Sequence, residues 1–162
     1  MNAIGDMRLA GASDFDFLLG SWKVEHRKLR DRLAGSSDWF SFTGTMHADP
    51  ILGGLGNFDQ NVIDAPEGAY QACTLRMFHP ETRLWSLHWI DGRDPKIDAP
   101  LFGSFANDVG TFFGDDLFRE RPIKLRFHWS QEGPAKARWD QAFSPDDGKS
   151  WEVNWMMEFT RA

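Results

Sequence analysis

The chain has 162 residues, 41% hydrophobic and 26% charged, a composition typical of one globular domain that excludes disordered, collagen-like and coiled-coil chains. Its 24 acidic residues outnumber its 18 basic ones, and the net charge of −6 argues against nucleic acids and anionic membranes as main partners. The single cysteine, Cys73, excludes an internal disulfide and fits a reducing, cytoplasmic location.

The first twelve residues show no hydrophobic periodicity, so we expect an N-terminal arm at 1–12 and one barrel domain at 13–162. The arm lacks the basic start and apolar run of a secretory signal, and no later segment approaches the length of a membrane span. Residues 13–20 combine a capping-box spacing with a glycine stop, which predicts a short helix. The apolar residues on one face of this helix, expected to plug one end of the fold, are Phe15, Leu18 and Leu19.

From Trp22 onward, ten runs rich in Phe, Trp, Thr and Val alternate with Gly, Pro, Asn and Asp clusters, the pattern of strands and turns. The runs cover 21–29, 38–47, 55–63, 69–78, 84–91, 101–106, 109–115, 122–130, 137–144 and 151–160. Most links are short, which predicts antiparallel neighbours, and no helix-length segment allows a βαβ plan. The predicted fold is all-β, a single antiparallel up-and-down barrel of 8–10 strands, because closure removes exposed edges.

The two ends of such a barrel receive alternate links and should differ. We expect the helix to close one end, while the longer and more charged loops rim an open mouth at the other. The mouth loops are predicted at 30–37, 64–68, 92–100, 116–121 and 145–149.

Period-two alternation predicts an aromatic interior whose only polar members are His26 and Gln141, with no inward carboxylate. In the tenth run, Trp151, Val153 and Trp155 are assigned to the inner face and Asn154 to the outer one. Residues of the mouth-side half are the candidate ligand-binding set: His26, Trp89, Leu125, Phe127, Gln141 and Trp155. Residues toward the base are expected to be structural: Trp22, Trp85, Trp129, Trp139 and Arg161.

Gly20-Ser21-Trp22 at the head of the first strand, with Arg161 ending the last, resembles the G-x-W and C-terminal arginine of lipocalins and their calycin relatives. The segments Phe17–Trp22, Arg76–Pro80 and Met157–Arg161 are similar to a bacterial family of lipocalin-like barrels of unknown function, over about residues 14–161. The resemblance implies the barrel and supplies no activity. Because the first and last strands are neighbours in a closed barrel, Arg161 is expected to stack on Trp22.

The segment from Ser144 to Trp151 resembles the Asp-box, S-x-D-x-G-x-T-W, with serine in place of threonine. In sialidases this motif is a hairpin turn away from the catalytic centre. It therefore predicts a structural turn.

No metal or cofactor site is expected. The five histidines stand singly on different strands, and the neighbouring acids of 115–116 and 146–147 diverge, which disfavours a glycosidase. Haem is a disfavoured alternative. An inward His26 resembles the axial ligand of nitrobindin-type barrels, but Trp22 is followed by Lys-Val-Glu-His rather than by a glycine-rich opening.

The predicted function is binding of a small, largely apolar or aromatic molecule inside the barrel, without catalysis. One alternative is an isomerase or cyclase in which His26 moves a proton while Gln141 polarises a carbonyl. Another is a packed barrel whose surface binds a protein, and a homodimer also stays open.

Overall fold

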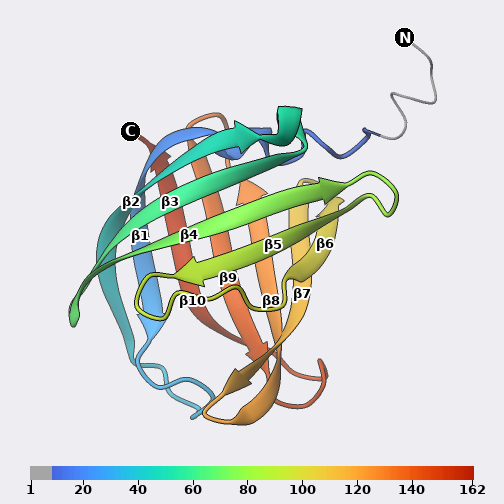
Figure 1. Ribbon diagram of the computed structural model, residues 1–162. Helices are drawn as coiled ribbons and strands as arrows, with labels where there is room; N and C mark the ends of the chain where they lie inside the picture. Colours follow the sequence, from blue (N-terminus) through green and yellow to red (C-terminus); the bar gives the residue numbers. More distant parts are fainter. Residues whose placement is uncertain (1–8) are drawn as a thin grey trace.

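The structure, a computed structural model, describes residues 9–162 and is an all-β closed barrel (Figure 1). Its elements are η1 (Asp16–Leu18), β1 (Gly20–Leu29), β2 (Trp39–Ile51), η2 (Leu52–Gly54), β3 (Gly56–Ala65), β4 (Gly68–His79), β5 (Leu84–Asp91), β6 (Leu101–Ala106), β7 (Val109–Phe118), β8 (Arg121–Gln131), β9 (Lys136–Ser144) and β10 (Glu152–Arg161). The ten predicted runs correspond one to one with these strands.

Each strand pairs antiparallel with its neighbours in the sequence, and β1 also pairs with β10 to complete the ring. In that last pairing, Trp22 lies opposite Arg161. The up-and-down barrel predicted from the sequence is thereby confirmed, and each of its ten strands is paired with a neighbour on both sides.

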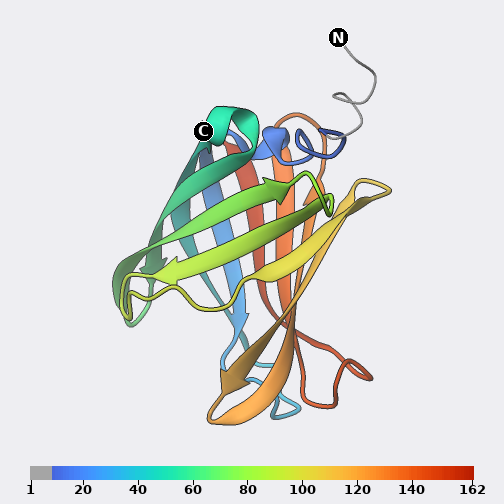
Figure 2. The same ribbon diagram turned by 45° about the vertical axis from the view of Figure 1, so that its right-hand side comes forward.

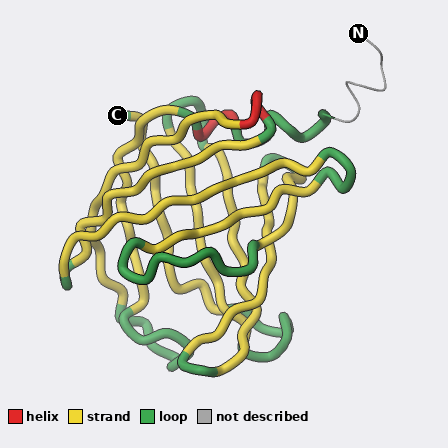
Figure 3. Tube along the Cα trace, in the orientation of Figure 1, coloured by secondary structure: helices red, strands yellow, loops and turns green. Residues whose placement is uncertain are grey.

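The links alternate between two ends, as predicted. The closed end, at the top of Figure 1, holds η1, η2 and short turns. The long loops 30–38 and 145–151 lie at the bottom, at the mouth, and loop 92–100 crosses the front of the barrel below β5 (Figure 3). The ring is weakest between β5 and β6, which share only three residue pairs, from Trp85↔Gly103 to Leu87↔Leu101. Loop 92–100 runs beside this seam (Figure 2).

The predicted N-terminal helical plug is wrong. Residues Asp16–Leu18 form a lone 3-10 turn without a side-chain cap, because the backbone here makes turn-type bonds such as Asp16 N–H to Ser13 O (3.0 Å). Phe15 and Leu18 are nevertheless fully buried, whereas Leu19 is half-buried and already extended toward β1. Residues 1–8 of the predicted arm lie outside the described part of the chain.

The closed half is filled by interlocked aromatic rings. The Phe15 ring meets Trp85 and Phe105 edge to face, each at 4.9 Å between centroids, and stacks near Phe112 at 5.6 Å. Edge-to-face pairs of this kind add to the gain from burial alone. The closed end is therefore packed with aromatic rings.

The predicted faces of β10 are wrong at its start. Trp151 and Val153 are half-buried, and Trp151 packs against Arg126 (4.7 Å from its ring centroid) and the exposed Phe113. Asn154, expected outside, is fully buried. A bulge between Val153 and Trp155 shifts the register and reverses the alternation before Trp155.

Candidate functional site

The mouth-side half of the barrel contains a cavity of about 110 Å³. Its lining residues are Leu87, Trp89, Asp98, Ala99, Leu101, Asp115, Asp116, Leu125, Phe127, Trp139, Gln141 and Trp155. Five of the six candidate ligand-binding residues are in this set, and His26 is not. Trp139, assigned to the base from the sequence, is also on the cavity wall, so that placement is wrong.

Aromatic rings form one continuous wall of the cavity. Trp155 meets Trp89 and Trp139 edge to face, with centroids 5.9 and 5.4 Å apart, and Trp139 meets Phe127 at 4.9 Å. Gln141 interrupts this wall, and its Nε2 donates a hydrogen bond to Oδ1 of the buried Asn154 (2.9 Å). The bulge in β10 that buries Asn154 therefore fixes the one amide in the wall.

His26 positions this wall rather than lining it. Nε1 of Trp155 donates to Nδ1 of His26 (3.2 Å), and the imidazole stacks on Phe42 with centroids 4.6 Å apart. Gly44 leaves room for the ring, since a Cβ there would lie 3.2 Å from Nε2. Burial, and secondly the charge of Lys28, lower the pKa of His26 to about 4, so the imidazole is neutral at pH 7.

Lys28 also faces inward at the mouth. Its Nζ lies 4.3 Å from the centroid of the Trp155 ring. Burial, followed by the charges of Arg32 and Arg93, lowers the pKa of Lys28 to about 8. The alternation that places Trp22 and His26 inside reaches Lys28 two residues later, so one more step along β1 would have found it.

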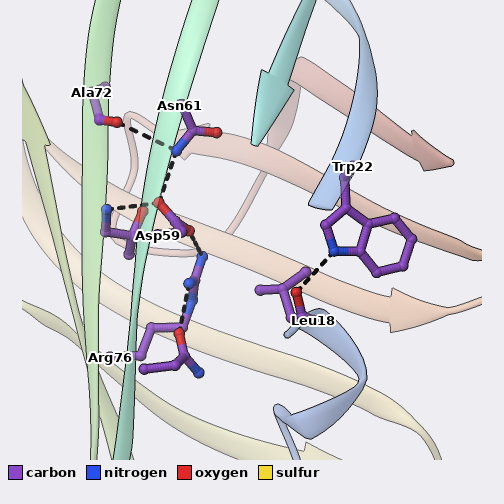
Figure 4. Close-up of polar contacts among 8 residues, drawn as sticks. Leu18, Trp22, Asp59, Asn61, Ala72 and Arg76 are labelled. Carbon is purple, nitrogen blue, oxygen red and sulfur yellow. Dashed lines mark hydrogen bonds and ion pairs between the residues drawn. The ribbon is translucent and has the colours of Figure 1, made fainter. Parts of the chain in front are cut away.

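A buried ion pair lies inside the barrel on β3 and β4, so the prediction of an interior without carboxylates is wrong. Asp59 on β3 and Arg76 on β4 are 1% and 2% exposed, and Oδ2 of Asp59 lies 2.6 Å from Nη2 of Arg76 (Figure 4). The polarity of β3 is inverted: Asn57, Asp59 and Asn61 are buried while Val62 is exposed. The apolar residues Phe58 and Val62 alternate with these polar ones, so the sequence pattern predicts that Phe58 and Val62 face inward and the polar residues outward, the reverse of the observed burial.

The ion pair belongs to a wider hydrogen-bond network. Oδ1 of Asp59 accepts from Nδ2 of Asn61 (2.7 Å) and from the Thr74 backbone N–H (2.8 Å), and Nη1 of Arg76 donates to Oδ1 of Asn57 (2.9 Å). Nε of Arg76 is buried without a partner among the described residues. All of these residues except Asn57 line a second space of about 20 Å³, which shares the lining residues Leu87, Trp89, Phe127 and Trp139 with the cavity. Its further lining residues include Met46, Trp129, Met157 and Phe159.

At the closed end, the predicted contact of Arg161 with Trp22 is present, with the guanidinium 3.8 Å from the indole centroid. Arg161 also donates to the carbonyl oxygens of Phe17 (2.6 Å) and Leu19, and Nε1 of Trp22 donates to that of Leu18 (2.8 Å, Figure 4). Side chains from the first and last strands thus satisfy three successive carbonyl groups of the entering chain.

The rim of the cavity is acidic on the side of the weak seam. Asp98, Asp115 and Asp116 line the opening, and Asp115 pairs with Lys124 at 2.6 Å. The Asp-box-like turn lies at the same end and is held by hydrogen bonds within the turn itself. Asp146 accepts bonds from the Ser144 hydroxyl (2.9 Å) and from the Ser150 backbone (2.8 Å) and hydroxyl (2.6 Å), which lower its pKa to about 2, the Ser150 hydroxyl contributing most.

A haem does not fit this site. The cavity of about 110 Å³ is smaller than the roughly 300–1,000 Å³ of pockets for drug-sized ligands, and His26, the expected axial ligand, is off the cavity wall. Between residues 9 and 162, no group of three or more His, Cys, Asp and Glu side chains is placed to hold a metal ion. No helix in this same range is long and apolar enough to cross a membrane.

Comparison with known proteins leaves the site to be interpreted from its own geometry: no family model matches the sequence, and a search of the curated proteins finds no match.

Proposed function

We propose that this barrel binds a small, largely apolar or aromatic molecule in its mouth-side cavity and performs no chemistry on it. The observation that carries the proposal is the contrast within the barrel, since the closed half is filled by interlocked rings while the mouth half leaves about 110 Å³ unfilled. An apolar space with a few fixed polar groups is the usual form of a small-molecule site. The G-x-W start with Arg161 against Trp22 supports a place among lipocalin-like barrels.

The enzyme alternative receives less support. A proton shuttle needs its imidazole beside the substrate, whereas Nδ1 of His26 already accepts from Trp155 and the ring is off the cavity wall. The protein-interaction alternative requires a packed interior, and the cavity argues against it.

Native mass spectrometry of freshly purified protein, followed by titration of tryptophan fluorescence with small aromatic molecules, tests the proposal. Saturable quenching is expected. The affinity obtained from it should fall at least tenfold in Trp89→Ala, because this substitution removes part of the cavity wall. Trp151→Ala is the matched control, because Trp151 packs against Arg126 and Phe113 away from the cavity. Equal losses in the two variants, or no binding of any small aromatic molecule, would overturn the proposal.

A further inference from the structure

The size of the cavity limits the ligand to one ring. An engineered apolar cavity of about 150 Å³ holds a benzene molecule, and the space here is of the same order at about 110 Å³. Fatty-acid chains and fused ring systems are too large for it. The edge-to-face arrangement of Trp89, Trp139 and Trp155 favours a flat aromatic ring, which can pack against them as they pack against one another.

The inner space limits the substituent on that ring. At about 20 Å³ it has room for a single oxygen atom, since one water molecule needs roughly 10–15 Å³ by the same measure. Its polar lining consists of Asp59, Asn61, Thr74 and Arg76. Arg76 and Asn61 bring N–H donors to this lining, and Asp59 and Asn61 bring acceptor oxygens, so a hydroxyl oxygen can accept from Arg76 while donating to Asn61 or Asp59.

Charge complements this picture. Arg76 and Asp59 neutralise one another at 2.6 Å, so the inner space offers hydrogen bonds without net charge. A carboxylate or an ammonium group placed there would be buried without an unpaired counter-charge to offset its loss of hydration. The acidic rim formed by Asp98, Asp115 and Asp116 adds a further penalty for anions at the entrance.

We propose that the ligand is a neutral monocyclic phenol, with its ring in the 110 Å³ cavity and its hydroxyl oxygen in the 20 Å³ space beside Arg76 and Asn61. The proposal rests on the proposed function and narrows it to one chemical class. It also gives the buried ion pair a role, since the pair holds hydrogen-bonding groups at the floor of an otherwise apolar site.

Calorimetric titration of the wild-type protein with p-cresol, toluene, benzoate and benzylamine at pH 7 tests the proposal. Toluene lacks the hydroxyl of p-cresol and should bind about tenfold more weakly, the factor that one net hydrogen bond contributes. Benzoate and benzylammonium should bind more weakly than toluene. If toluene or benzoate binds as tightly as p-cresol, the phenol assignment falls while the binding function stands. If none of the four binds, both fall.

A second variant locates the hydroxyl. Thr74→Ile replaces the threonine hydroxyl and adds a methyl group to the inner space, which should reduce p-cresol affinity to that of toluene and leave toluene unchanged. Thr45→Ile on the exposed face of β2 is the matched control and should alter neither affinity. An unchanged preference for p-cresol in folded Thr74→Ile would overturn the placement of the hydroxyl. The ligand series on the wild type decides the phenol assignment even if this variant does not fold.

Discussion

The closed half and the mouth half of the barrel contain similar aromatic residues, but these residues have different roles in the two halves. At the closed end, Trp22 and Arg161 satisfy the backbone carbonyl groups of the entering chain, and the rings interlock without a ligand-sized space. At the mouth, Trp155 contacts both Trp89 and Trp139, yet the three rings leave a cavity. Aromatic content alone therefore does not mark a binding site. Here the candidate binding site is the part of the barrel in which buried polar groups still line unfilled space.

The strongest way to break this division is to disrupt the ion pair at the floor of the site. Asp59→Leu leaves the Arg76 guanidinium buried and uncompensated and should lower the free energy of unfolding by about 3–5 kcal/mol in urea denaturation. The double variant Asp59→Leu/Arg76→Leu should lose less than the sum of the single variants.

The exposed pair Arg30–Asp38, at 3.0 Å, supplies the control. Arg30→Leu should change the unfolding free energy by only about 0–1 kcal/mol. A loss in Asp59→Leu no larger than that of the control would show that the interior pair is solvated.

The next effect concerns His26, which supports the cavity wall through Trp155. The folded-state pKa is about 4 and the ordinary value is 6.5, so on acidification the unfolded chain binds the proton first. The unfolding free energy should therefore fall by about 2–3 kcal/mol from this group as the pH drops from 6.5 to 4. His26→Gln keeps an acceptor for Trp155 and does not titrate. Denaturation at several pH values should show that the unfolding free energy falls less on acidification in the variant than in the wild type. Parallel plots of unfolding free energy against pH would contradict the prediction.

Arg161→Met tests the closed end separately from the site. It removes two hydrogen bonds to the carbonyls of Phe17 and Leu19 and the stack on Trp22, and we expect a loss of about 2 kcal/mol by thermal denaturation. Arg121→Met, at an exposed position of β8, is the control and should be close to wild type. Ligand affinity should be unaffected in Arg161→Met, and a matching loss of binding would show that the two halves are coupled.

The smallest effect belongs to Lys28 at the mouth. Its folded-state pKa of about 8 lies below the ordinary 10.5, so the unfolded chain binds more protons between these values and stability rises with pH. Relative to Lys28→Met, the wild type should gain about 1 kcal/mol in unfolding free energy between pH 7 and 9. Lys23→Met, on the exposed face of β1, should show no such gain. The same slope for both lysines would mean that Lys28 is solvated.

Strand positions, barrel closure and most of the aromatic wall were predictable because period-two alternation is strong in β8 and in the first part of β9. The polar floor was not, because β3 buries Asn57, Asp59 and Asn61 and exposes Val62. Only tertiary partners such as Arg76 make that inversion favourable, and a single strand does not reveal its partners. The start of β10 escaped for a related reason, since a bulge changes the phase of a pattern without changing its composition.

The pairing of Trp22 with Arg161 has a consequence for how the chain folds. β1 must wait for β10, at the far end of the described sequence, before its second edge is covered. Such a contact costs loop-closure entropy before it returns any stabilisation, which places folding in the slow, milliseconds-to-seconds regime of β-rich topologies. Until that step, β1 carries an open row of amide and carbonyl groups able to pair with another chain. The exposed side chains Ser21, Lys23, Glu25 and Arg27, which alternate along this strand, are suited to discourage association during that interval.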